Sequence, residues 1–181
     1  MKKVAITLFL LVSFSTFAQK YYTKTGNTQF KASVRAFEPV EATNNSTTAI
    51  ININSGEIAS LLFVKAFNFR VALMQEHFNE NYMDSGTFPK ATFKGLISDF
   101  DFSEISSTEK KLLLKGILTV RGVEKKIETL ATFSKNEDKL LMEASFGVQP
   151  EDFNIKIPKI VSNKIAGTIN ISLAYEFIEK K

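Results

Sequence analysis

The sequence contains no cysteine and no tryptophan, and it has a single histidine, His77. Without cysteine the chain has no disulfide framework, no thiol nucleophile and no cysteine-ligated metal site, and no lipid can be attached to a cysteine near its start. An exported domain without disulfides depends on its own apolar core for stability. One histidine also limits the catalytic sites that this chain could assemble.

The chain also has little excess charge. It has 23 lysine and arginine residues against 19 aspartate and glutamate residues, and two of the lysines, Lys2 and Lys3, belong to an N-terminal leader. The remaining 21 basic residues give a net charge of about +2, so no nucleic-acid partner is expected. No glycine-rich loop that could cradle phosphate precedes a helix, and no two carboxylates stand out as an acid and base pair.

The first 18 residues have the three parts of a signal peptide. A charged start is followed by an apolar run from Val4 to Phe17 and by small residues before a cleavage site after Ala18. The run is shorter than the roughly 20 residues of a membrane-spanning helix, and no second such run follows, so we expect cleavage rather than a membrane anchor. The predicted mature chain, residues 19–181, has the length of one domain and is expected in the periplasm or outside the cell.

Alternation of apolar and polar residues predicts a series of strands. Turn residues at Asn54-Ser55-Gly56 and at Arg121-Gly122 predict two hairpins. The polar run at residues 42–48 is compatible with a short edge strand or with a loop, and residues 149–153 with a helical turn. The predicted strands cover approximately residues 28–36, 49–54, 57–64, 90–98, 112–120, 123–134, 140–148 and 165–175.

The stretch of residues 73–95 changes from helical to strand periodicity. Met74, Phe78 and Tyr82 recur every four residues and give a short helix one apolar and aromatic face. After a polar turn with a glycine, residues 90–98 alternate as in a strand. A short helix among strands has only a sheet against which to bury its apolar face, so we expect it to pack on or plug the sheet.

About eight short strands with one or two short helices predict an all-β fold. Parallel strands would need long helical crossovers, so the sheet is expected to be antiparallel and to form a barrel or a sandwich. Closure removes exposed sheet edges, which favours the barrel. An outer-membrane barrel is disfavoured because the strands lack aromatic girdles. Fourteen phenylalanines remain after the leader, and they either fill such a barrel or line a cavity in it.

Two polar clusters are candidates for metal binding or catalysis. Glu76, His77 and Glu80 lie on the predicted helix, but adjacent helical residues point about 100 degrees apart, so Glu76 and His77 do not converge on one ion. The acidic loop at residues 99–104 lacks the number and spacing of ligands that calcium needs. We therefore interpret His77 as structural and the loop as a solvated connection, and we expect no metal and no cofactor.

Three segments carry a resemblance to a known family. They are EHFNENYMDSGTFPKATFKG (residues 76–95), GILTVRGVEKKIETLATF (116–133) and ASFGVQPEDFNI (144–155). With these segments the chain resembles the YceI-like family of secreted bacterial proteins over nearly the whole predicted mature sequence. It departs from the family pattern near its start, where the usual family has a longer opening with a histidine-bearing strand.

The resemblance implies a lipocalin-like antiparallel barrel at residues 19–181 that holds an isoprenoid or similar long-chain amphipathic lipid. The expected role is to carry or sequester that lipid without catalysis; a homodimer stays open. Arg70 is expected to meet a polar or phosphate head group, because it lies where a predicted strand meets the helix. The residues expected to line or close the cavity are Phe30, Phe67, Phe69, Met74, Phe78, Phe93, Leu118, Phe133, Phe146 and Ile169.

Two other classes of function stay open. A barrel filled with its own side chains would serve as an interaction module of the cell envelope and would have no cavity. A hydrolase or a metal-dependent enzyme would use His77 and would lose its activity when that residue is replaced.

Overall fold

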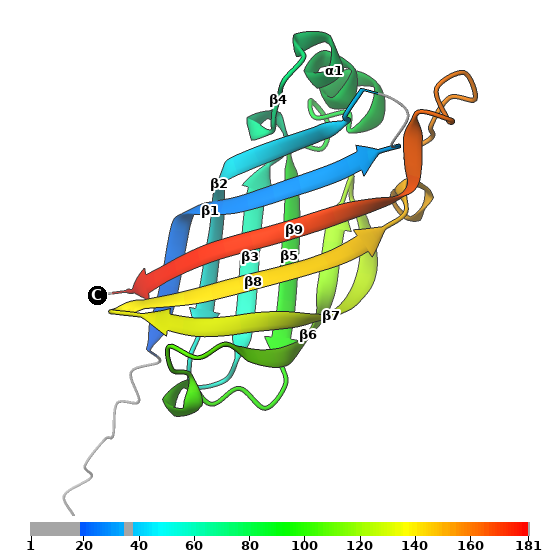
Figure 1. Ribbon diagram of the computed structural model, residues 1–181. Coiled ribbons are helices and arrows are strands. Elements are labelled where there is room, and N and C mark those ends of the chain that lie inside the picture. Colours follow the sequence, from blue (N-terminus) through cyan, green and yellow to red (C-terminus); the bar gives the residue numbers. More distant parts are fainter. Residues whose placement is uncertain (1–18, 35–37, 181) are drawn as a thin grey trace, which may run out of the picture.

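The computed structural model describes residues 19–34 and 38–180, which form a nine-stranded antiparallel sheet (Figure 1). The predicted signal peptide, residues 1–18, lies outside the described residues. The strands are β1 (Lys20–Ser33), β2 (Glu41–Asn52), β3 (Glu57–Phe63), β4 (Asn68–Phe69), β5 (Lys90–Ile97), β6 (Lys110–Val120), β7 (Val123–Asn136), β8 (Lys139–Val148) and β9 (Ile165–Glu179).

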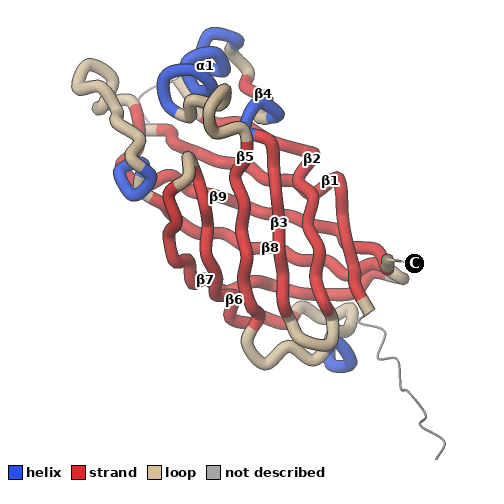
Figure 2. Tube along the Cα trace, turned by 180° about the vertical axis from the view of Figure 1, so that it is seen from behind, coloured by secondary structure: helices blue, strands red, loops and turns tan. Residues whose placement is uncertain are grey.

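The sheet closes into a barrel because β1 pairs with two strands. The order around the barrel is β1, β9, β8, β7, β6, β5, β3 and β2, and β2 pairs again with β1. The short strand β4 adds to β2 at one end. Figure 2 shows the opposite side of the barrel, with β3, β5 and β2 in front of β8 and β9. The predicted all-β antiparallel barrel is thus confirmed, and closure protects its strand edges.

The two ends of the barrel differ. One end, here termed the mouth, carries α1 (Ala72–His77) and the π-helical turn η2 (Phe78–Tyr82) that continues it, here together termed the helical segment (Figure 1). It also carries the short helix η4 (Pro150–Phe153). The turn η1 (Val64–Ala66) leads into β4 at the same end. The opposite end, here termed the base, carries η3 (Phe102–Glu104).

The helix predicted from the spacing of Met74, Phe78 and Tyr82 is confirmed. It widens at its end, because the amide of Met83 donates to the carbonyl of Phe78, five residues back, at 2.9 Å. The helix begins without a side-chain cap, and it is too short to be stable alone, so packing against the barrel holds it. All three spaced side chains turn toward the barrel interior.

The polar run at residues 42–48 is neither an edge strand nor a loop. It belongs to β2, which pairs with β1 on one side and with β3 and β4 on the other. Asn44 and Thr47 are buried, which the polar pattern did not predict. The Asn44 amide donates to the carbonyl of Phe63 at 3.0 Å, and its oxygen accepts the amide of Ser46 at 2.8 Å. These hydrogen bonds offset the free-energy cost of burying the polar side chain.

The acidic loop between β5 and β6 closes the base. Its carboxylates are exposed, as expected for a solvated connection, but Phe100, Phe102 and Ile105 turn inward and pack on the core. The Lys135 ammonium donates to the Phe102 carbonyl at 2.8 Å and lies 3.7 Å from the centre of its ring. The loop is therefore a plug as well as a connection.

The base half of the barrel is filled with side chains. Inward residues of β2, β5, β7, β8 and β9 meet there, and the largest of them have less than 2% of their surface exposed. Around these side chains the barrel interior is filled by protein atoms. The fully buried apolar side chains of this half include Ile51, Ile97, Phe133, Leu140, Met142 and Phe177.

Candidate functional site

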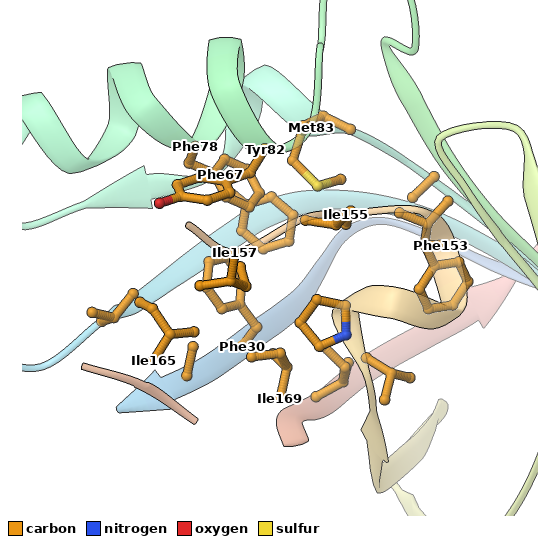
Figure 3. A pocket seen from close by; sticks show the side chains of 18 of the residues that line it. Phe30, Phe67, Phe78, Tyr82, Met83, Phe153, Ile155, Ile157, Ile165 and Ile169 are labelled. Carbon is orange, nitrogen blue, oxygen red and sulfur yellow. The ribbon is translucent and has the colours of Figure 1, made fainter. Parts of the chain in front are cut away.

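The mouth half of the barrel is hollow. It contains a cavity of about 340 Å³, here termed the mouth cavity, which lies within the range of ligand pockets in proteins. Figure 3 shows that its side chains come from β1 and β9, from the helical segment η2 and from η4 with the loop after it. Aliphatic residues of the strands complete the wall, among them Leu62, Ala91, Leu118, Val120, Val148, Ile165, Ile169 and Ile171.

Four phenylalanines form one wall of the mouth cavity. Phe30 of β1 stacks on Phe78 with ring centres 5.2 Å apart, and it meets Phe67 and Phe69 edge to face at 5.3 and 5.7 Å. Phe78 also contacts Phe67 and Phe69. Aromatic pairs of this geometry each contribute about 1 kcal/mol beyond burial. The cluster therefore fixes the helical segment over the mouth.

The opposite wall is made by η4 and by residues 155–164, here termed the mouth loop. Phe153 is buried, and Ile155, Ile157 and Val161 of the loop line the cavity (Figure 3). An ion pair of 2.5 Å between Lys125 of β7 and Asp152 of η4 connects this wall to the barrel. The mouth cavity is thus enclosed by the helical segment on one side and by the mouth loop on the other.

Arg121 joins the two walls. It lies in the turn between β6 and β7, where it and Gly122 have positive φ angles of 49° and 73°, as expected of the predicted hairpin. Its Nη1 donates to the carbonyl of Asn154, the residue after η4, at 2.7 Å. Its guanidinium lies 5.7 Å from the ring centre of Phe88, which follows the helical segment. Opening of the mouth would break at least one of these contacts.

Few polar side chains line the mouth cavity. His77 and Tyr82 belong to the helical segment, Lys164 to the mouth loop, and Thr28 to the floor. The first three belong to segments at the mouth, where a polar group of a ligand would remain close to solvent. Below them the described residues of the lining are apolar except for Thr28, so the interior suits burial of a hydrocarbon chain.

Thr28, at the floor of the mouth cavity, belongs to a hydroxyl network with Thr47 and Tyr175. The Thr28 hydroxyl lies 2.8 Å from that of Thr47 and 3.1 Å from that of Tyr175. Burial raises the pKa of Tyr175 above its ordinary value, while hydrogen bonds with Thr28, Ser60 and Thr47 oppose the rise. Thr28 also lines a second cavity of about 60 Å³ that lies deeper in the barrel. The network thus stands between the hollow half and the filled half.

Phe93 and Phe146 line the smaller cavity. Gly95 of β5 and Gly116 of β6 face each other in register, and the ring of Phe93 lies across both. A Cβ atom on Gly95 would stand 2.7 Å from that ring, and one on Gly116 would stand 2.5 Å from it. The two glycines therefore allow the Phe93 ring to lie flat along the inner wall.

The residues predicted to line or close a cavity separate into three groups. Phe30, Phe67, Phe69, Met74, Phe78, Leu118 and Ile169 line the mouth cavity. Phe93 and Phe146 line the smaller cavity, which Leu118 also borders. Phe133 and Arg70 line neither cavity: Phe133 is fully buried in the base half, and Arg70 is exposed before α1.

The structure adds lining residues that the sequence analysis did not name as site residues. Ile155, Ile157 and Val161 lie in a segment for which the sequence predicted neither a strand nor a helix. The alternation Ile-Lys-Ile at residues 155–157 is the signal that could have shown that one side of this segment is apolar. Tyr82 and His77 were placed on the helix but were not expected to reach the cavity. Of the cations in the part of the chain that the structure describes, Lys164 lines it and Arg70 does not.

Within 19–34 and 38–180, no three His, Cys, Asp or Glu side chains are grouped so that they could hold a metal ion. His77 is exposed at the cavity entrance. In the same part of the chain, no helix has the length and apolar character needed to cross a membrane.

Solved structures with the same fold include three bacterial proteins. A polyisoprenoid binding domain from Saccharophagus degradans, implicated in plant cell wall breakdown, has a TM-score of 0.76 at 12% identity and covers 90% of this chain and 99% of its own. BcnA of Burkholderia cenocepacia has a TM-score of 0.69 at 16% identity, covering 83% and 95%. The YCEI protein of Campylobacter jejuni has a TM-score of 0.63 at 18% identity, covering 80% and 87%.

At these identities the likeness shows the fold alone. None of the curated proteins compared matches this chain. The sequence pattern that describes the YceI-like domain, in contrast, matches residues 12–177, which include every strand of the barrel through the greater part of β9. The protein therefore belongs to the YceI-like family.

Proposed function

We propose that this protein binds one amphipathic lipid, with a prenyl or acyl chain in the mouth cavity and a polar head group at the mouth. The protein carries or sequesters the lipid after export to the periplasm or beyond, and it performs no chemistry on it. One observation supports this function above others: among the described residues, the barrel holds a large apolar hollow at its mouth, and most of its base half is filled. The polyisoprenoid binding domain of the same fold supports a prenyl chain in particular.

The volume of the mouth cavity limits the length of the chain. An apolar cavity of about 150 Å³ takes up benzene, with its six carbons. On that ratio, a cavity of 340 Å³ has room for about 14 carbons, or about three isoprene units. The filled base half prevents deeper entry, so the remainder of a longer chain would extend beyond the mouth.

The driving force is burial of hydrocarbon. Each methylene removed from water contributes about 0.8 kcal/mol, which is about fourfold in affinity. We therefore expect affinity to rise with chain length up to about 14 carbons and then to level off. The side chains of His77, Tyr82 and Lys164 at the mouth would influence the choice of head group.

The first experiment identifies the natural ligand. The mature protein, residues 19–181, is produced by export in a bacterial host, its native mass is recorded, and it is extracted with organic solvent. One bound prenyl or acyl lipid per protein is expected. A protein that releases no lipid, and takes up no prenyl alcohol or fatty acid of any length, would contradict the proposal. That result would favour an interaction module of the envelope.

A further inference from the structure

The mouth loop has an unusual composition for a cavity wall. Between residues 155 and 164 it carries Lys156, Lys159 and Lys164 and no acidic residue. It also carries Ile160, which is 86% exposed, more than any other large apolar residue among the described residues. Lysines around an exposed apolar tip are the features by which peripheral proteins contact anionic lipid surfaces.

The loop presents different residues to its two sides. Ile157 and Val161 line the mouth cavity, whereas Lys156, Lys159 and Ile160 are exposed. A surface that engaged the exposed side would therefore contact a segment that also encloses the ligand.

The backbone hydrogen bonds of this loop are local. The amide of Val161 donates to Pro158 at 3.0 Å, that of Ser162 to Lys159 at 3.3 Å, and that of Lys164 to Val161 at 2.9 Å, while the amide of Ile155 donates back to Pro150 in η4 at 3.0 Å. These bonds close turns within the loop and join it to η4, and they do not belong to the barrel ladder. Displacement of the loop would therefore leave the strand pairing intact.

The opposite wall has the reverse charge. The helical segment, α1 and η2, carries two exposed carboxylates, Glu76 and Glu80. It also has an exposed apolar side chain, Leu73, at 57%, but no lysine beside it. An anionic surface repels these carboxylates and attracts the lysines of the mouth loop. The mouth would therefore approach such a surface with the loop first and the helix tilted away.

We propose that the mouth loop docks on an anionic phospholipid bilayer, with Ile160 inserted between the head groups and Lys156 and Lys159 against their phosphates. The bilayer matches the loop in charge, and it takes up an exposed apolar side chain without needing a shaped groove. Docking in this orientation directs the opening of the mouth cavity toward the membrane.

Binding of ligand-free protein to vesicles tests this proposal separately from the proposed function, because it requires no lipid in the cavity. Flotation is measured with vesicles of phosphatidylglycerol and phosphatidylcholine and with vesicles of phosphatidylcholine alone. We expect binding to the anionic vesicles that weakens as salt is raised. Replacing Lys156 and Lys159 together by Gln should weaken it about 30-fold, at about fivefold for each lysine. Ile160→Ser should weaken it about tenfold.

Matched variants on the barrel wall serve as controls. Lys94 and Lys126 are exposed and lie on either side of Ile117 on neighbouring strands, and Leu130 is 58% exposed on β7. Replacing Lys94 and Lys126 together by Gln, or Leu130 by Ser, should leave flotation unchanged. Equal losses in loop and control variants, or no preference of the unmodified protein for anionic vesicles, would overturn the proposal. Thermal unfolding confirms that each variant is folded.

Discussion

The hydroxyl of Tyr175 lies 3.1 Å from the Oγ1 of Thr28, although 147 residues separate them in the sequence. Thr28 borders both cavities, whereas Tyr175, which is 3% exposed, borders only the smaller of the two and packs with the core of the base half. The pair joins β1 to β9 at the level where the barrel changes from hollow to filled. It combines a polar floor for the ligand with a fixed point in the core.

Replacing Tyr175 by Phe should lower the free energy of unfolding by about 1 kcal/mol at neutral pH, since Thr28 keeps its bond to Thr47. Burial raises the pKa of Tyr175, so the folded state holds this proton more tightly than the unfolded chain. The stability from the hydroxyl is therefore present below pH about 10 and is lost as pH rises further. Urea unfolding of both proteins from neutral to alkaline pH should show the difference shrinking; a constant difference would contradict this role.

Replacing Gly116 by Ala should destabilise the protein by about 2 kcal/mol, because the new methyl group would collide with the backbone carbonyl of Lys94 as well as with the Phe93 ring. The matched control is Gly167→Ala on β9, where a Cβ atom meets nothing within 4 Å. That change should be neutral or stabilise by about 0.5 kcal/mol. Thermal and urea unfolding compare the two variants, and equal effects would show that the Phe93 ring is not confined.

Replacing Phe146 by Ala should lengthen the chain that the barrel accepts. Removing this ring enlarges the smaller cavity, which shares Thr28 and Leu118 with the mouth cavity. A benzene-sized space corresponds to about six more carbons, so the chain length at which affinity levels off should increase by about that number. Titration with alcohols of rising length measures it. Phe102→Ala at the base should cost stability without moving this limit.

Replacing Arg121 by Gln should speed ligand release. The variant loses the charged hydrogen bond to Asn154 and the contact with Phe88, both of which hold the mouth closed. A loss of about 1.5 kcal/mol from the closed state makes opening about tenfold more frequent. Stopped-flow displacement of a fluorescent lipid measures the release rate. An unchanged rate would mean that the lipid leaves by a route that avoids this contact.

Replacing His77 by Ala distinguishes a carrier from an enzyme. Because the side chain is exposed at the entrance, stability should change by no more than about 0.5 kcal/mol and affinity by about twofold. Equilibrium titration and thermal unfolding provide both values. A hydrolytic activity present in the unmodified protein and absent in the variant would instead favour catalysis.

Local chemistry made part of the fold predictable. The turn at Arg121-Gly122 depends on two residues with positive φ, and the helix face depends on four-residue spacing, so both could be read from short stretches. The start of β1 could not. β1 begins at Lys20 rather than near Thr28, since irregular pairing between Thr23 and Thr28 interrupts the alternation.

The division of the barrel was beyond sequence analysis. Phe30 and Phe133 both occupy inward positions of alternating strands, yet Phe30 borders the mouth cavity and Phe133 is sealed in the base half. The difference depends on how much volume the other strands bring to each level. The burial of Thr47 could not be predicted for a related reason, because its hydrogen-bond partner Thr28 lies on another strand.

Because the base half is filled, opening of the mouth and unfolding of the whole barrel occur at different rates. Strands that are locked in a dense core open only when the whole molecule unfolds, while segments held by a few contacts open far more often. The mouth loop is of the second kind, and the core beneath Tyr175 is of the first. If the protein binds a lipid as proposed, that lipid would enter and leave many times within the lifetime of one folded molecule.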